Sequence, residues 1–74
     1  MALVKKLEKI IKEHTRVHSG TDCTYVVFSD SNGDKYLQLD TVGSKNRQMP
    51  GKISQSIQFG PEAIKQLKDI IKNL

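Results

Sequence analysis

The chain lacks tryptophan, has a single cysteine and contains no long apolar run. Without an apolar stretch near the ~18 residues that a membrane-spanning helix needs, we expect a soluble protein with no membrane partner. The lone Cys23 excludes an intramolecular disulfide, and small secreted domains usually depend on several. The first residues interleave apolar side chains with Lys and Glu and do not resemble a signal peptide. We therefore expect a cytoplasmic protein.

The length of 74 residues predicts a single domain covering residues 1–74. A chain this short buries only roughly 60% of its unfolded surface, so its hydrophobic core is thin. A homodimer would relieve that shortage, and we expect one.

Charge is unevenly distributed around the net value of +4. Residues 20–40 carry Lys35 against four Asp, whereas residues 41–59 carry Lys45, Arg47 and Lys52 with no acidic residue. Cations on a segment bounded by Gly and Pro suit a ligand that presents phosphates, because phosphate contacts need donors and positive charge together. The alternative interpretation of this basic segment is a solvated connector.

Hydrophobic spacing predicts an amphipathic helix at each end of the chain and three strands between them. The first helix covers residues 3–14, the strands lie near residues 23–28, 36–40 and 52–59, and the second helix begins at Pro61. Asn32-Gly33 predicts a type I′ hairpin turn after the first strand. That strand carries apolar groups on both faces, so it is either central or at a dimer contact. The expected fold is α+β, ordered α-β-β-β-α, with both helices on one face of a three-stranded antiparallel sheet.

The other face of this sheet is expected to be polar and open to solvent or a ligand. Gln55, on the inner side of the third strand, would need a hydrogen-bond partner if buried. The aromatic ring of Tyr36 could stack on a base, and the Ser and Gln side chains supply donors. The residues expected to bind nucleic acid are Tyr36, Gln38, Lys45, Arg47, Lys52, Ser54, Ser56 and Gln58.

Motifs for catalysis, metals and cofactors are weak. The acidic turn imitates the first ligands of an EF-hand loop, but Lys35 and Thr41 stand where that loop requires Gly and Glu. His14, His18 and Cys23 are too few for a closed metal site, and a Cys23 nucleophile would lack an orienting third group and a pocket. Gly51-Lys52 does not complete a Walker phosphate loop. We expect no catalytic residue, metal or cofactor, and hence not an enzyme.

The stretch KYLQLDTVGSKNRQMPGKISQSIQFGPEAIKQLKDII, with EHTRVH and DCTY before it, resembles a family of short uncharacterised bacterial and phage proteins. More loosely, a strand, PGK, an alternating strand and then Gly-Pro-Glu opening a helix looks like the second half of the positive-cofactor-four type of single-stranded-DNA-binding coactivator. This second resemblance covers about half of the chain. It implies a dimer joined by its helices, whose sheets grip single strands through Lys45, Arg47 and Lys52 on phosphates and Tyr36 on a base.

The function expected first is therefore a small dimeric protein that binds single-stranded DNA or RNA, mainly through backbone contacts. A second hypothesis is a nucleotide- or signalling-dinucleotide-binding protein that sequesters its ligand for a phage or bacterial defence system, with Arg47, Lys52, Ser54 and Gln55 lining the pocket. A third is a protein-interaction module that uses Tyr25, Val27 and Phe28, or Tyr36.

Overall fold

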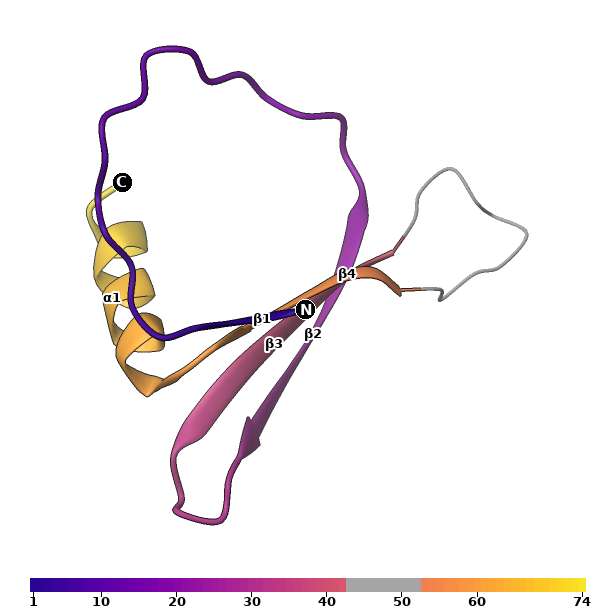
Figure 1. The fold of residues 1–74 in the computed structure, drawn as a ribbon, viewed down its shortest axis with the longest axis vertical. Helices are drawn as coiled ribbons and strands as arrows, with labels where there is room; N and C mark the ends of the chain where they lie inside the picture. Colours follow the sequence, from indigo (N-terminus) through magenta and orange to yellow (C-terminus); the bar gives the residue numbers. More distant parts are fainter. Residues whose placement is uncertain (43–52) are drawn as a thin grey trace.

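The computed structural model describes residues 1–42 and 53–74. Within these ranges the chain forms four strands followed by one helix (Figure 1). The elements are β1 (Ala2–Val4), β2 (Asp22–Ser29), β3 (Lys35–Val42), β4 (Ile53–Phe59) and α1 (Pro61–Lys72).

The strands form one mixed sheet in the order β1-β4-β3-β2. β2, β3 and β4 pair antiparallel in sequence order, whereas β1 pairs parallel with β4. β2 therefore lies at one edge of the sheet, so the central position considered for this strand is wrong. A dimer contact through β2 stays a prediction. α1 packs beside β3 and β4, and both α1 and the long connection from β1 to β2 curve away on one side of the sheet (Figure 1).

The predicted N-terminal helix is wrong, and so is the expected α-β-β-β-α order with a three-stranded sheet. Leu3 and Val4 lie in β1, and residues 5–21 have no helix or strand. Ile10 and Ile11, on the predicted apolar stripe, are 72% and 93% exposed. A short amphipathic helix is marginal unless its apolar face packs on something. Here the edge of β4 instead offers backbone hydrogen-bonding groups that extend residues 2–4 into a strand.

The predicted C-terminal helix is confirmed. α1 has Gly60 as its N-cap, Pro61 in its first turn, Glu62 near the positive end and Lys72 near the negative end. Ala63 is fully buried, and Ile64 and Leu67 are partly covered. Within the described ranges, no helix combines the length and apolar content needed to cross a membrane.

The hairpin between β2 and β3 is confirmed, but its turn is not type I′. Gly33 has a φ of +83°, and among the described residues no residue other than glycine has a positive φ. Type I′ would require a positive φ at Asn32 as well. The Gly33 amide donates to the Asp30 carbonyl oxygen, which closes a four-residue turn that ends at the left-handed glycine. The Asp30 carboxylate stabilises this geometry by accepting from the amides of Asn32 and Asp34.

The two faces of the sheet differ in polarity, because residues that alternate along a strand point to opposite sides. One face carries Leu37, Leu39, Ile57 and Phe59 from the two central strands. The apolar stripe of α1 packs against these two strands, whose apolar side chains lie on this face. The opposite face carries Gln38, Asp40, Ser56 and Gln58 and is not covered by the helix.

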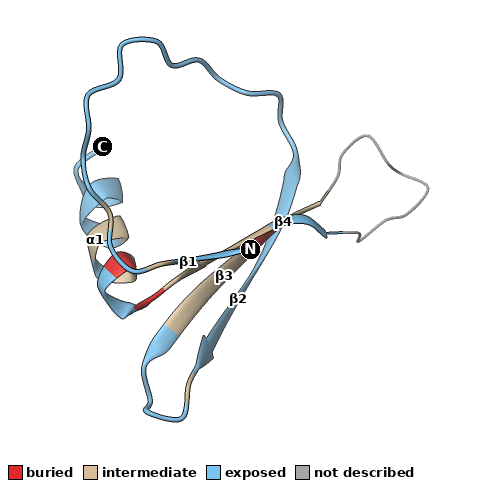
Figure 2. Cartoon of the chain, viewed as in Figure 1, coloured by how far each residue is buried: buried red, intermediate tan, exposed pale blue. Residues whose placement is uncertain are grey.

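Little of the molecule is buried (Figure 2). Ala63 is the one hydrophobic residue classed as buried in the described part of the chain. The accessible surface is 6944 Å². The scaling of surface with mass gives about 4,600 Å² for a folded monomer of 8.3 kDa. Part of this excess comes from the extended connection of residues 5–21, and part from the exposed strand β2.

Candidate nucleic-acid interface

Four side chains on the helix-free face form a hydrogen-bonded group, which we call the polar cluster: Gln38, Asp40, Ser56 and Gln58. The Gln38 amide nitrogen lies 3.1 Å from both Asp40 carboxylate oxygens. The Ser56 hydroxyl donates to Asp40 Oδ1 at 2.5 Å. The Gln58 amide nitrogen donates to Gln38 Oε1 at 2.8 Å. One connected network thus ties β3 to β4 across the sheet.

Strand register explains why these residues meet. Gln38 lies opposite Gln58, and Asp40 lies opposite Ser56. Opposite residues of an antiparallel pair point to the same face, with side chains close enough to hydrogen-bond. Residues 38 and 40 are two apart, so the alternation of a strand places Gln38 and Asp40 on the same face. The pairing register, which brings Ser56 to Asp40, was not readable from the sequence.

Asp40 was not among the expected site residues, yet its carboxylate is the acceptor at the centre of the polar cluster. The residue is only 9% exposed. Two side-chain donors offset the cost of burying its charge. Its negative charge makes the middle of this face unsuitable for a phosphate. The face can instead present hydrogen-bonding amides and hydroxyls to a neutral group such as a base edge.

An aromatic pair adjoins the polar cluster on the same face. Phe28 lies opposite Tyr36 in the β2–β3 register, and their rings are stacked with centroids 5.5 Å apart and planes 14° apart. Phe28 is 38% exposed. Sequence reasoning selected only Tyr36 as a stacking residue. Phe28 was missed because its strand carries apolar groups on both faces, and only its register with Tyr36 identifies the pair.

The Tyr36 hydroxyl donates to Asp30 Oδ2 at 3.1 Å. This hydrogen bond, together with the negative charge of Asp30, raises the pKa of the Tyr36 phenol; slight desolvation and the charge of Asp34 add to the effect. The phenol stays neutral at physiological pH and acts as a donor. The acidic turn thereby fixes the orientation of the aromatic pair.

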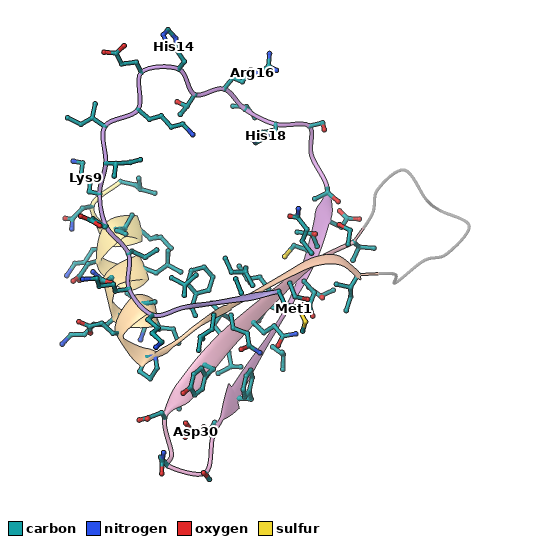
Figure 3. All side chains as sticks on the ribbon, viewed as in Figure 1. Met1, Lys9, His14, Arg16, His18 and Asp30 are labelled. Atoms are coloured by element: carbon teal, nitrogen blue, oxygen red, sulfur yellow. The ribbon has the colours of Figure 1, made fainter. Side chains whose placement is uncertain are left out.

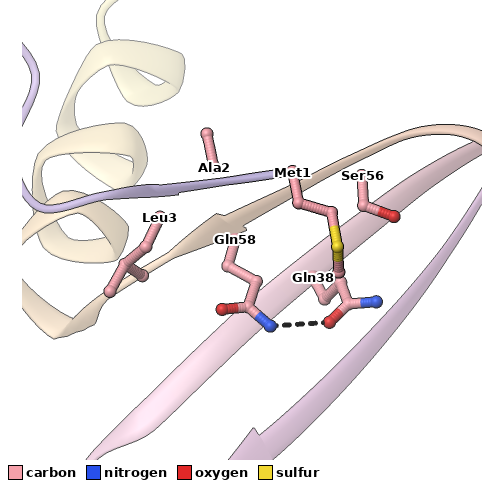
Figure 4. A pocket seen from close by; sticks show the side chains of 6 residues that line it. All are labelled: Met1, Ala2, Leu3, Gln38, Ser56 and Gln58. Atoms are coloured by element: carbon pink, nitrogen blue, oxygen red, sulfur yellow. Dashed lines mark hydrogen bonds between the residues drawn. The ribbon is translucent and has the colours of Figure 1, made fainter.

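A small hollow borders the polar cluster where β1 passes it (Figure 4). Its volume is about 180 Å³. Ligand pockets for drug-sized molecules usually span about 300–1,000 Å³, so a signalling dinucleotide does not fit inside it. The hollow is large enough to take part of a single flat ring. Its lining residues are Met1, Ala2, Leu3, Gln38, Ser56 and Gln58.

The structure brings together only part of the predicted site. Tyr36, Gln38, Ser56 and Gln58 share the helix-free face. Ser54 does not join them. It is exposed, and its hydroxyl lies 3.0 Å from the Thr41 hydroxyl. The β3–β4 pairing shifts register at this point, between Thr41 and Val42. The three predicted phosphate-binding residues, Lys45, Arg47 and Lys52, lie outside the described residues.

Other residues singled out in the sequence contribute no organised site. Gln55 is exposed opposite Thr41 and therefore does not face a buried environment. His14 and His18 lie exposed on the long connection (Figure 3). Cys23 is a free, exposed thiol. Residues 1–42 and 53–74 contain no group of three or more side chains able to hold a metal ion.

Comparison of the chain with family models, curated proteins and solved structures returned no match. The two family resemblances therefore stay predictions.

Proposed function

We propose that the protein binds single-stranded nucleic acid across the helix-free face of its sheet, as a homodimer. The observation that carries this proposal is the stacked pair Phe28–Tyr36 on the same face as the amides of Gln38 and Gln58. Sequence-tolerant single-strand binders combine aromatic rings, on which bases stack, with cations that follow the phosphate backbone. The aromatic pair supplies the first of these elements.

The charged residues favour different positions for the bases and the phosphates of a bound strand. Asp40 disfavours a phosphate over the polar cluster, whereas the amides of Gln38 and Gln58 can exchange hydrogen bonds with base edges. The basic segment joins Val42 at the end of β3 to Ile53 at the start of β4. Bases would thus contact the sheet face, and the predicted contacts of Lys45, Arg47 and Lys52 would neutralise phosphates.

The nucleotide-binding hypothesis remains the alternative. The hollow of about 180 Å³ is too small for a dinucleotide, and part of one base ring would fill it. A mononucleotide would saturate a pocket, whereas a sheet face that tracks a strand needs several linked phosphates. The proposal includes a cytoplasmic location, which the unpaired Cys23 favours, and no enzymatic activity.

The test is a fluorescence-anisotropy titration with a labelled single-stranded oligonucleotide at several salt concentrations, with a duplex and mononucleotides as competitors. We expect salt-sensitive binding that neither competitor displaces well. Tyr36→Ala should weaken it by about 5- to 150-fold, the equivalent of about 1–3 kcal/mol for one stacked base. Ile70→Ala, which truncates a 48% exposed apolar residue on α1, is the control.

A charge-matched pair of variants tests the phosphate contacts. Arg47→Ala with Lys52→Ala and Lys65→Ala with Lys68→Ala both lower the net charge from +4 to +2. Lys65 and Lys68 are exposed on α1. Only the first pair should flatten the dependence of log affinity on log salt, by about 0.7 for each lost phosphate contact. Absence of binding at low salt, or equal effects of both pairs, would refute the proposal.

A further inference from the structure

Within residues 1–42 and 53–74, no strand pairs with the outer edge of β2. All eight of its residues, Asp22–Ser29, are exposed. Between Cys23 and Ser29 it has no charged residue and no proline, and its pairing with β3 runs without a bulge. Natural edge strands normally carry lysine, proline or a bulge, or are covered, because an open edge recruits another strand. β2 therefore has the properties of an interface strand.

The hairpin fixes which backbone groups of β2 face outward. The Asp30 amide donates to the Asp34 carbonyl oxygen at 3.0 Å, so this opposite pair is hydrogen-bonded. Hydrogen-bonded pairs recur at every second residue of an antiparallel ladder. Phe28, Val26 and Thr24 thus bond to β3, and the intervening residues direct their N–H and C=O groups away from the sheet. The outward-facing residues are Cys23, Tyr25, Val27 and Ser29.

The side chains of β2 are too apolar for a solvent-facing strand. Tyr25 and Val27 are 73% and 56% exposed on the α1 side, and Val26 is 48% exposed on the other. The whole chain exposes 6944 Å², against roughly 4,600 Å² expected for this mass, and β2 contributes to that excess together with the connection of residues 5–21. A second strand on this edge would cover apolar side chains that now face solvent.

We propose that β2 pairs antiparallel with β2 of a second copy of this chain, with the twofold axis at Val26. In this register Tyr25 lies opposite Val27 of the partner subunit, and Cys23 lies opposite Ser29 of the partner subunit. All four outward-facing residues of each copy then exchange backbone hydrogen bonds. The two sheets become one continuous sheet of eight strands.

Symmetry favours a second copy as the occupant. A twofold axis perpendicular to the sheet makes the β2 edge complementary to itself. In this register odd-numbered residues pair with odd-numbered residues and even-numbered with even-numbered, so paired side chains point to the same face of the continuous sheet. A register with Tyr25 on the axis would place Ser29 outside the paired strands. With Val26 on the axis, Asp22 meets Asp30 of the partner subunit at each end. There the Asp30 carboxylate already accepts hydrogen bonds from the amides of Asn32 and Asp34 in its turn and from the Tyr36 hydroxyl of β3, which offset the repulsion.

The dimer has a consequence that rests on the proposed function. The helix-free faces of both copies would lie on the same side of the continuous sheet. The two Phe28 residues would be roughly 14 Å apart, from the rise per residue and the strand spacing. A single strand crossing the interface could then reach both aromatic pairs.

Sedimentation over a range of protein concentrations, without nucleic acid, tests the dimer itself. We expect a dimer whose dissociation constant rises at least tenfold in Tyr25→Lys and in Val27→Pro. Val27→Pro removes an N–H that faces outward, so the hairpin with β3 is preserved. Ile71→Lys changes a 59% exposed apolar residue on α1 and should leave the dimer intact. A wild-type monomer at all concentrations, or dissociation by Ile71→Lys alone, would overturn the proposal.

Disulfide trapping tests the register even if an edge variant fails to fold. In a Cys23→Ser background, Val26→Cys places two thiols opposite each other across the axis in a non-hydrogen-bonded pair. The Cα separation of such a pair, about 4.5 Å, lies within disulfide range. Mild oxidation should give a covalent dimer with Val26→Cys and little with Ile71→Cys. Failure of Val26→Cys to cross-link, or equal cross-linking of both variants, would contradict the proposed pairing.

Discussion

Replacing Asp40 by Ala should destabilise the fold, because this carboxylate is the shared acceptor of the polar cluster. The substitution leaves the Gln38 amide nitrogen and the Ser56 hydroxyl without their acceptor. A hydrogen bond to a charged group contributes about 1.5–3 kcal/mol, and both donors are half-buried, so water satisfies them in part. We expect the free energy of unfolding to fall by about 3 kcal/mol. For a domain of this size, that corresponds to a melting temperature lower by about 12–24 °C.

The assay is thermal and denaturant unfolding followed by circular dichroism, with all variants at one protein concentration because a dimer's stability depends on concentration. Ser56→Ala removes one donor and should cost about 1.5 kcal/mol, roughly half as much. Asp40→Asn keeps one acceptor oxygen and should fall between Asp40→Ala and the wild type. The double variant Asp40→Ala/Ser56→Ala should cost less than the sum of the two single variants, because both remove the same hydrogen bond.

A free energy of unfolding for Asp40→Ala within about 0.5 kcal/mol of the wild type would refute this reasoning, since that is the usual range of surface substitutions. Water would then satisfy the donors as well as the carboxylate does. The polar cluster would not hold β3 to β4.

Two further predictions concern the turn and the long connection. In a Tyr25→Phe background, ultraviolet titration should show the Tyr36 phenol ionising above its ordinary pKa, and Asp30→Asn should lower that pKa. Because the folded-state pKa is raised, the stability that this hydrogen bond contributes is complete below the unfolded pKa of about 10 and is lost as pH rises through the folded value. An unchanged pKa in Asp30→Asn would contradict the assigned cause. Separately, Gln66→Ala should speed hydrogen exchange at the Leu7 amide and tryptic cleavage in the connection, because the Gln66 side chain bonds both the Leu7 amide and its carbonyl oxygen. Unchanged exchange at Leu7 would show that these bonds do not hold the connection to α1.

Local signals in the sequence were sufficient for α1 and for the β2–β3 hairpin. α1 combines an unbroken apolar stripe with Pro61 at its start and a charge of the favourable sign near each end. The hairpin follows from alternating apolar residues on either side of Asn32-Gly33. The turn type was not predictable from the dipeptide alone, because the Asp30 carboxylate favours a different geometry by accepting from two turn amides.

The N-terminal segment shows where local reasoning fails. Residues 3–14 have helical spacing, but a short helix depends on a surface that covers its stripe. Whether such a surface is free, or whether the open edge of β4 captures residues 2–4 first, depends on contacts more than fifty residues apart in sequence. The side-chain bonds between Gln66 and Leu7 belong to the same long-range arrangement.

The sequence by itself determined a small, cation-rich α+β chain with a hairpin, a C-terminal amphipathic helix and one polar sheet face, because composition and residue periodicity are local properties. Only the tertiary structure decided that Asp40 joins Gln38, Ser56 and Gln58, that Phe28 stacks on Tyr36, and that β2 is an open edge. Each of these depends on which residues stand opposite one another in neighbouring strands. Strand register and strand order are set by the packing of the whole sheet and not by any single segment.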